Sequence, residues 1–274
     1  MISVKNLHKA FGPKVIYDGL DLEIPRGETH VIIGRSGEGK SVLLKHLCGL
    51  LRPDKGRIEI AGERLRLQDP KSLAFVRGKV SMVFQAAALF DSMDVRRNVG
   101  FYLDEAGKLP VREIDDRVER LLNEVNLPHT GHLMPAELSG GMRKRVGLAR
   151  ALAMEPEIIL YDEPTTGLDP VTSDVINDLM VATKKRYNVT SIVVTHDMKS
   201  ALKVGDRISM LFERRLIFTG TPEELLNTDN PYVYQFVNGL SEGPITRGDD
   251  ERVSQQVAIR ESQIMKKIEE PVSK

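Results

Sequence analysis

The stretch that decides the fold is Gly34-Arg35-Ser36-Gly37-Glu38-Gly39-Lys40-Ser41, which follows the apolar run Thr29 to Ile33 and precedes apolar residues at helical spacing. This spacing of glycines before Lys-Ser matches the loop that wraps phosphate groups between a strand and a helix. The glycines let backbone N–H groups turn inward around phosphate oxygens, at the positive end of the following helix. In this pattern Lys40 neutralises phosphate charge and the Ser41 hydroxyl ligates Mg²⁺. We therefore predict a nucleotide site in an α/β protein of the P-loop class.

The residues before this loop favour a small antiparallel β layer. Apolar residues recur over Ile2 to Leu7 and Val15 to Ile24, and turn formers follow at Gly12-Pro13 and Pro25-Arg26-Gly27. Short runs joined by tight turns are typical of antiparallel strands.

The rest of the chain alternates strands with helices. We expect strands at Arg57 to Ala61, Val80 to Phe84, Ile158 to Asp162, Thr190 to Thr195 and Ile208 to Phe212. We expect helices at Ser41 to Leu51, Val111 to Val125, Met142 to Met154, Thr172 to Arg186 and Lys199 to Val204. The alternation implies right-handed crossovers between parallel strands, and therefore a mixed sheet with a parallel core.

Composition narrows the class of protein. The 274 residues suit one or two domains, and the lone Cys48 forms no disulfide framework and favours a reducing compartment. Lys plus Arg and Asp plus Glu each number 39, and this zero net charge argues against nucleic acid as a partner. Apolar runs stay far below the roughly 20 residues that cross a bilayer, and no secretory signal is visible at the start. If the protein serves a membrane, we expect a partner to supply the membrane part.

A second element, an apolar strand that ends in two acidic residues, complements the phosphate loop. The apolar run Ile158 to Tyr161 ends in Asp162 and Glu163. A P-loop ATPase needs an acid at this place to hold Mg²⁺, and Asp162 would take that role. Because side chains alternate along a strand, the next residue, Glu163, faces a different direction and would polarise the attacking water.

With these two elements in place, the chain resembles the ATP-binding subunits of ABC transporters. Leu138-Ser139-Gly140-Gly141-Met142 resembles the family signature LSGGQ, and Gln85 stands where the family has its Q-loop. The D-loop and switch histidine of the family match Gly167-Leu168-Asp169 and His196. The resemblance covers residues from Met1 to about Gly220.

The resemblance implies a role for each matched residue. Residues 34–41 contact the ATP phosphates, His196 contacts the γ-phosphate, and Gln85 positions water bound to Mg²⁺. Phe11 stands where the family stacks an aromatic ring on adenine, although a residue of the strand core is the alternative. Ser139, Gly140 and Gly141 form a glycine turn before a helix, which suits a γ-phosphate bound by a second copy. This implies a homodimer that holds two ATP molecules between its subunits.

Two positions depart from the family pattern. Met142 replaces the usual signature glutamine, and Val42 follows Ser41 where many relatives carry Ser or Thr. Neither change removes a phosphate-binding glycine, so ATP hydrolysis remains the expected activity. The methionine, with the run NPYVYQFVNGLSEGPI at Asn230 to Ile245, is similar to ATPases of the MCE/Mla lipid-trafficking branch.

The domain organisation follows from the same resemblance. Residues 1–244 are expected to form one ABC ATPase domain, with a helical subdomain at about 86–155. Residues 245–274 form a charged tail that is helical or disordered, with a regulatory or dimer-bracing role as a further possibility. The segment Ala86 to Met93 is apolar yet turn-like. It suits a groove for a helix of a membrane partner, lined by Leu89, Phe90 and Met93, or else ordinary subdomain core.

The function implied is an ATP-hydrolysing subunit that powers a membrane ABC transporter, with integral membrane permease subunits as partners. The narrower resemblance adds phospholipid transport, an MCE-domain lipid-binding partner and a peripheral place at the cytoplasmic face of the inner membrane. The alternatives are an importer of amino acids or metals, and a soluble ABC protein that acts on DNA or ribosomes. Paired cassettes, long coiled-coil inserts and zinc cysteines, which are common in that last class, do not occur in the sequence.

Overall fold

The computed structural model describes residues 1–247. The chain divides into two compact units, Met1–Pro222 and Glu223–Lys274. All residues that the sequence predicts for the nucleotide site belong to the first unit. The predicted tail from residue 245 lies, apart from its first three residues, outside the described residues.

A mixed sheet carries the site. In the described part of the chain it has six strands in the order β10-β9-β3-β8-β7-β6. The strands are β3 (Thr29–Ile33), β6 (Val80–Val83), β7 (Ile158–Asp162), β8 (Thr190–Val194), β9 (Arg207–Phe212) and β10 (Arg215–Gly220). β3 pairs in parallel with β8 and β9, β7 pairs in parallel with β6 and β8, and β10 pairs with β9 in the antiparallel sense. The prediction of a mixed sheet with a parallel core is confirmed.

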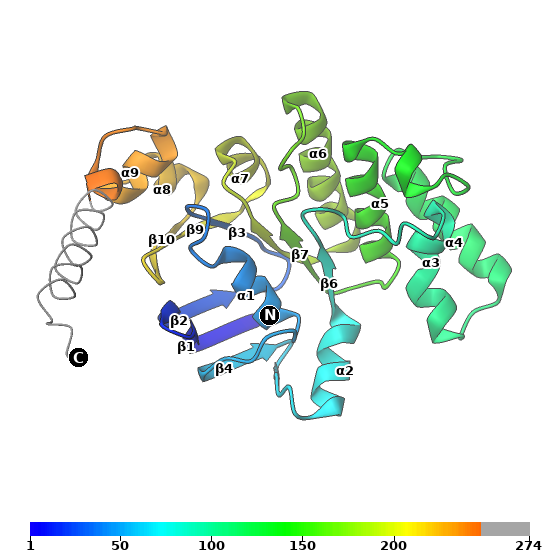
Figure 1. Ribbon diagram of the computed structural model, residues 1–274, viewed down its shortest axis with the longest axis horizontal. Coiled ribbons are helices and arrows are strands. Elements are labelled where there is room, and N and C mark those ends of the chain that lie inside the picture. The colour runs from blue at the N-terminus through cyan, green and yellow to red at the C-terminus, as the bar shows by residue number, and fades with distance from the viewer. Residues whose placement is uncertain (248–274) are drawn as a thin grey trace, which may run out of the picture. The chain divides into compact units, whose positions relative to one another are not determined.

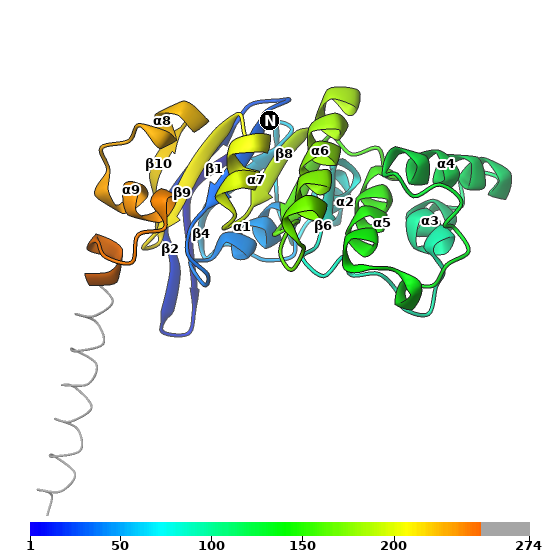
Figure 2. The same cartoon turned by 90° about the horizontal axis from the view of Figure 1, so that it is seen from above.

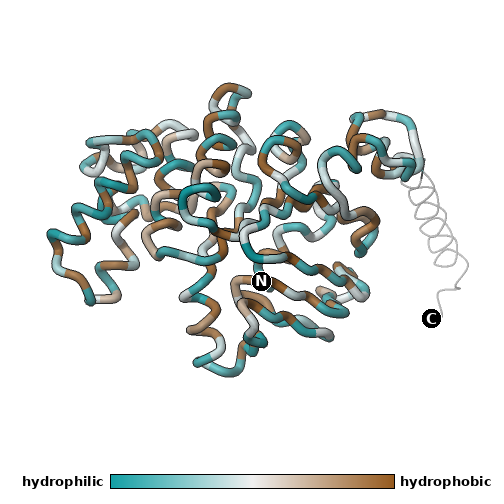
Figure 3. Tube along the Cα trace, turned by 180° about the vertical axis from the view of Figure 1, so that it is seen from behind, coloured by the Kyte–Doolittle hydropathy of each residue, from teal (hydrophilic) through white to brown (hydrophobic). Residues whose placement is uncertain are grey.

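A smaller antiparallel sheet holds the first strands of the chain, in the order β2-β1-β4-β5. Its strands are β1 (Ile2–Phe11), β2 (Lys14–Ile24), β4 (Lys55–Ile60) and β5 (Glu63–Arg64). Burial alternates along much of β2, so one face of this sheet meets the core and the other meets water. The alternating hydropathy colours along these strands show the same pattern (Figure 3). The antiparallel layer predicted from the first residues is therefore confirmed.

The main core lies between the two sheets. Helix α1 (Lys40–Leu47) occupies this space, and its buried leucines join one apolar cluster with residues of both sheets. Representative members from the two sheets are Ile2, Val4, Leu20, Ile58, Leu160, Ile192 and Val194. Helices α5 (Gly140–Leu152), α6 (Pro170–Tyr187) and α7 (Met198–Val204) lie on the other side of the six-stranded sheet (Figure 1). The P-loop helix is thus fixed by apolar packing on both sides.

Helices dominate the stretch between β6 and β7. Helices α3 (Val95–Ala106) and α4 (Val111–Glu124) pack against each other and against α5, and the three lie together in both views (Figure 1, Figure 2). The apolar stripe of α4 buries Ile114, Val118, Leu121 and Leu122, as its spacing predicts. Helix α2 (Pro70–Lys79) precedes β6. Along residues 1–247, no helix combines the length and the apolar character needed to span a bilayer.

The described part of the second unit is built around one buried amide. It contains the end of α8 (Pro222–Leu226) and α9 (Pro231–Asn238), which Asn230 caps by accepting from two backbone N–H groups. Gln235 is 4% exposed, donates to the Leu240 carbonyl at 3.2 Å, and accepts from the Ile245 N–H at 2.8 Å. A Cβ at Gly243 would lie 2.4 Å from the Gln235 side chain, so a larger residue there would have to displace this buried amide.

The structure corrects several expected elements. The helix expected to reach Leu51 ends at Leu47, because Gly49 takes the left-handed conformation (φ +68°) that terminates helices. The helix expected from Met142 begins two residues earlier, at Gly140. The sequence patterns did not single out β5, α2, α3, β10, α8 or α9, although Val95, Val99 and Leu103 of α3 are buried at helical spacing.

Candidate nucleotide site

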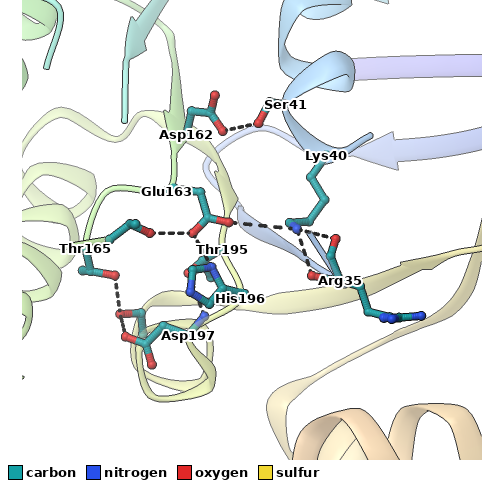
Figure 4. Close-up of polar contacts among 12 residues, drawn as sticks. Arg35, Lys40, Ser41, Asp162, Glu163, Thr165, Thr195, His196 and Asp197 are labelled. Atoms are coloured by element: carbon teal, nitrogen blue, oxygen red, sulfur yellow. Dashed lines mark hydrogen bonds and ion pairs between the residues drawn. The ribbon is translucent and has the colours of Figure 1, made fainter. Parts of the chain in front are cut away.

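Three parallel strands deliver the predicted residues to one edge of the sheet. β3, β8 and β7 are neighbours, and each is followed at its carboxyl end by a predicted site residue. β3 leads into the P-loop, β7 ends in Asp162, and β8 leads to His196. The side chains of Lys40, Glu163 and His196 converge there (Figure 4). This edge is where ligands bind in open α/β sheets.

The P-loop backbone depends on glycine at two close approaches. Gly34 has φ +151°, and a Cβ there would lie 2.4 Å from the carbonyl oxygen of Leu211. Gly39 has φ +106°, and a Cβ there would lie 2.6 Å from Ile16 Cγ2. The Tyr17 hydroxyl also donates to the Gly39 carbonyl at 2.5 Å, so β2 of the antiparallel sheet braces the loop. At both positions the backbone takes a conformation that favours glycine, and there is no room for a Cβ.

Lys40 is held in the centre of this loop. Its side chain is 6% exposed, and Nζ donates to the carbonyls of Gly34 at 2.8 Å and Arg35 at 3.0 Å. Burial lowers the pKa of Lys40, while Glu163, Glu38 and Asp162 act in the opposite direction. An ammonium held by two carbonyls of a phosphate loop is positioned to meet an anion there.

Ser41 and Asp162 form a hydrogen-bonded pair. Ser41, in the first turn of α1, donates from Oγ to Asp162 Oδ1 at 2.7 Å. Asp162 is the last residue of β7 and is 8% exposed. A hydroxyl and a carboxylate are oxygen ligands of the kind that Mg²⁺ prefers, so the pair fits the predicted metal position.

Glu163 is fixed from several directions. It has φ +50°, an uncommon conformation for a residue other than glycine, and its N–H donates to the Val194 carbonyl at 2.9 Å. Oε2 lies 2.8 Å from His196 Nδ1 and accepts from the Thr166 hydroxyl at 2.9 Å. Oε1 lies 4.0 Å from Lys40 Nζ. The carboxylate therefore stands between the P-loop lysine and the histidine (Figure 4).

The predicted signature residues lie apart from this cluster, at the start of α5. Ser139 caps the helix by accepting from the Met142 N–H at 3.2 Å. An ideal Cβ at Gly140 would lie 3.5 Å from Leu168, and one at Gly141 would lie 2.5 Å from Thr172 Cγ2. The signature turn thus packs against the D-loop and the first turn of α6.

The remaining predicted residues surround the site. Phe11 lies at the tip of the β1–β2 hairpin, is 47% exposed, and has Lys9 Nζ 5.2 Å from its ring centroid. This exposure excludes the alternative of Phe11 as a core residue. Gln85 follows β6 and is exposed.

Three further predicted residues lie within the P-loop itself. Ser36 and Gly37 together form its turn. The next residue, Glu38, accepts a hydrogen bond from the Glu213 N–H at 3.1 Å.

Two residues that contact Glu163 were not predicted. Thr166 donates to its carboxylate, and Lys144 Nζ donates to its backbone carbonyl at 3.3 Å. Lys144 carried a usable signal, because it lies one helical turn after Gly140 and Gly141 and therefore on the same face of α5. Thr166 carried no comparable signal in the sequence.

Comparisons with known proteins agree with this geometry. The family model described as ABC transporter matches residues 17–166. The probable ribonucleotide transport ATP-binding protein mkl of Mycobacterium leprae is 42% identical over 264 residues, covering 95% of this chain and 76% of that protein. The intermembrane phospholipid transport system ATP-binding protein MlaF of Haemophilus influenzae is 40% identical over 245 residues, covering 89% and 93%.

A solved structure gives the same result for the fold. It is a dimeric ATP-binding cassette in a post-hydrolysis state, bound to ADP and Pi. It matches with a TM-score of 0.74 and 31% identity over 81% of this chain and 99% of its own. The chain described here belongs to the ABC transporter family, as an ATP-binding subunit that hydrolyses ATP.

Proposed function

We propose that this chain hydrolyses ATP in the P-loop cradle with Glu163 as the residue that activates water. The observation that carries the proposal is the placement of the Glu163 carboxylate, 4.0 Å from Lys40 Nζ and 2.8 Å from His196 Nδ1. Phosphoryl transfer needs little covalent help from the protein, so positioning and charge supply most of the rate enhancement.

Each residue then has a defined role. The glycine-rich turn, Gly34, Arg35, Ser36, Gly37, Glu38 and Gly39, surrounds the phosphates with backbone N–H groups, and Lys40 exchanges its carbonyl partners for phosphate oxygens. Glu163 accepts a proton from the attacking water, and His196 donates to the γ-phosphate. Thr166 keeps the Glu163 carboxylate oriented through its 2.9 Å hydrogen bond. Phe11 offers an exposed ring to the adenine.

Ser41 and Asp162 are the residues that would hold Mg²⁺, with Gln85 placing a water that the ion binds. The 2.7 Å hydrogen bond between Ser41 and Asp162 brings two oxygen ligands together. When bound, Mg²⁺ neutralises charge on the phosphate oxygens. Gln85 carries a neutral amide, which suits orienting a water better than accepting its proton.

A second copy of this chain completes each site. Ser139 is exposed and caps α5, and Gly140 and Gly141 follow it in the first turn beside the D-loop and α6. The N-terminus of a helix attracts anions, so this end of α5 suits a phosphate group. The dimeric state of the solved cassette supports a homodimer in which each signature addresses the nucleotide of the neighbour.

An apolar cavity supports docking of an integral membrane permease. It has a volume of about 660 Å³ and is lined by residues of α2, β6, α3, α5 and the segment after β6. Its lining includes Phe90, whose ring lies 4.8 Å from that of Phe101, but neither Leu89 nor Met93. Buried Asn98 donates to the carbonyls of Phe90, Met93 and Asp94, so the segment that forms one wall is fixed in place.

The cargo that we propose is phospholipid, with the chain bound peripherally to its permease at the cytoplasmic face of the inner membrane. The similarity to MlaF, a protein named for intermembrane phospholipid transport, over 93% of that protein supports this cargo. An MCE-domain lipid-binding protein is the further partner that we propose. The similarity to Mkl, a protein named for ribonucleotide transport, makes ribonucleotides the rival cargo.

The test combines turnover with assembly. We expect the purified chain with ATP and Mg²⁺ to form a dimer by light scattering and to release phosphate. Gly141→Arg places a long side chain against Thr172, so it should remove turnover while one copy still binds ATP through its P-loop. Equal phosphate release by wild type and Gly141→Arg would reject the shared site. Mass spectrometry of the complex in mild detergent tests the cargo: co-purified phospholipid supports the proposal, and a complex that carries no phospholipid contradicts it. Bound adenine nucleotide does not count for the rival cargo, because the ATP sites themselves retain it.

A further inference from the structure

A buried lysine lies on α5 one helical turn beyond the signature glycines. Lys144 is 8% exposed. Burial lowers its pKa, and the neighbouring Glu163 opposes that shift. Lysines are seldom buried unless paired, because removing an ammonium from water is costly. Its partners therefore show what this lysine does in the fold.

The Lys144 ammonium bonds to the turn that carries Glu163. Nζ donates to the carbonyl of Thr166 at 2.7 Å and to the carbonyl of Glu163 at 3.3 Å. The same turn is closed by a hydrogen bond from the Thr166 N–H to the Glu163 carbonyl at 3.3 Å. A single ammonium thus bonds both ends of the turn whose side chains, Glu163 and Thr166, are joined at 2.9 Å.

The signature end of α5 is also in close contact with the element that follows this turn. A Cβ at Gly141 would lie 2.5 Å from Thr172 Cγ2, and Asp169 caps α6 by accepting from the N–H groups of Val171 and Thr172 at 3.0 Å. There is little free space for α5 to move without displacing this region. Packed interfaces of this kind transmit small displacements, since they are close to incompressible.

We propose that Lys144 is a positioning residue that ties the Glu163 carboxylate to the signature end of α5. The inference rests on the proposed function, because it takes Glu163 as the activating residue and Ser139 to Gly141 as the contact with the second copy's ATP. When α5 closes on the neighbour's nucleotide, Lys144 carries that movement to the carbonyls of Glu163 and Thr166. Occupancy of one site therefore orients the carboxylate of the other, and hydrolysis at the two sites is cooperative.

The test compares two nearly isosteric substitutions in the full chain, Lys144→Met and Lys144→Gln. Both remove the charge, but only glutamine keeps an N–H donor for the carbonyls. Lys185→Met, which changes an exposed lysine near the end of α6, is the matched control. ATP hydrolysis is measured over a range of ATP concentrations, together with Tm.

We expect Lys144→Met to lower kcat by about 10- to 100-fold, as loss of a charged hydrogen bond predicts, with the half-saturating ATP concentration within about 2-fold of wild type. Its Hill coefficient should fall toward one. The kcat of Lys144→Gln should exceed that of Lys144→Met by about 2- to 13-fold, which is the range expected for one neutral hydrogen bond. The control should match wild type.

Three results overturn the inference: unchanged kcat and Hill coefficient in Lys144→Met, equal kcat in the Met and Gln variants, or a parallel loss of kcat, ATP affinity and Tm. Glu163→Gln, measured alongside, separates the positioning role from the proposed function. If it is inactive while Lys144→Met is fully active, only the positioning role fails. If it is as active as wild type, the proposed function fails and the role of Lys144 fails with it.

Discussion

Replacing Glu163 by glutamine isolates the effect of one negative charge. The amide has the shape of the carboxylate and still accepts from the Thr166 hydroxyl, which lies 2.9 Å from Oε2. It does not accept a proton from water at neutral pH. Activation of a nucleophile by a positioned base contributes roughly 10²- to 10⁴-fold to a rate. We therefore expect kcat to fall by that factor, which corresponds to about 2.7 to 5.4 kcal/mol in the activation free energy.

The same substitution should strengthen ATP binding. Glu163 Oε1 lies 4.0 Å from Lys40 Nζ, and both side chains are largely buried. At an effective dielectric constant of about 20, a pair at this distance attracts by about 4 kcal/mol. Without the carboxylate, the Lys40 ammonium has no competing anion and interacts more strongly with the phosphates. The repulsion between Glu163 and the γ-phosphate is also removed. Both effects act in the same direction, so ATP should accumulate in a stable dimer.

The assay measures phosphate release and dimer mass by light scattering on the same samples with ATP and Mg²⁺. Glu113→Gln, which changes an exposed carboxylate in the first turn of α4, serves as the control. The reasoning is refuted if Glu163→Gln turns over within about 3-fold of wild type, since the base effect predicts a loss of at least about 10². It is also refuted if the variant no longer binds ATP.

Further predictions concern the rim of the site, the cavity and two buried histidines. Phe11→Ala should raise the Kd for ATP by about 2- to 13-fold, the worth of stacking beyond burial, with kcat unchanged in the saturated enzyme; an unchanged Kd by calorimetry would remove Phe11 from the adenine site. Phe90→Glu should abolish co-purification with the permease, because it places a charge in the apolar cavity, while the free chain should bind ATP normally. Val111→Glu, which changes an exposed residue, is the control. Equal recovery of the permease by both variants would contradict docking at the cavity. Burial lowers the pKa of His30 and His46 below the ordinary 6.5, so the stability from these neutral rings is complete above about pH 6.5 and is lost as pH falls through their lowered pKa values. Tm should therefore fall between about pH 7.5 and about pH 5.5, and His30→Gln should reduce that decrease; the same decrease in the variant would exclude a contribution from His30.

Much of the candidate site was predictable because its residues follow recognisable local patterns. The P-loop, the acidic pair after β7 and His196 each follow an apolar strand that the sequence marks clearly. Parallel strands bring their carboxyl ends to one edge, so predicting parallel neighbours also predicts that Lys40, Glu163 and His196 meet. The structure confirms this meeting, with separations of 4.0 Å and 2.8 Å about the Glu163 carboxylate.

Other features depended on contacts that no local pattern encodes. The helix expected to continue to Leu51 stops at Leu47, because the left-handed conformation of Gly49 outweighs the helical spacing of nearby leucines. Of the three residues predicted to line a docking groove, Phe90 lines the cavity, whereas Leu89 and Met93 do not. The rest of the lining comes from α2, β6, α3 and α5, and this set depends on tertiary packing. Val42, which departs from the family pattern, packs against the main core.

A phosphate loop, two strand-end carboxylates and a signature turn can be recognised without coordinates, since each is written in adjacent residues whose backbone geometry and chemistry are local. How these parts are held becomes visible only in the folded chain: Tyr17 of the small sheet against Gly39, Thr166 on the Glu163 carboxylate, and Lys144 on the carbonyls behind it. Such contacts join residues brought together by packing of whole elements, and that packing depends on many weak apolar interactions at once.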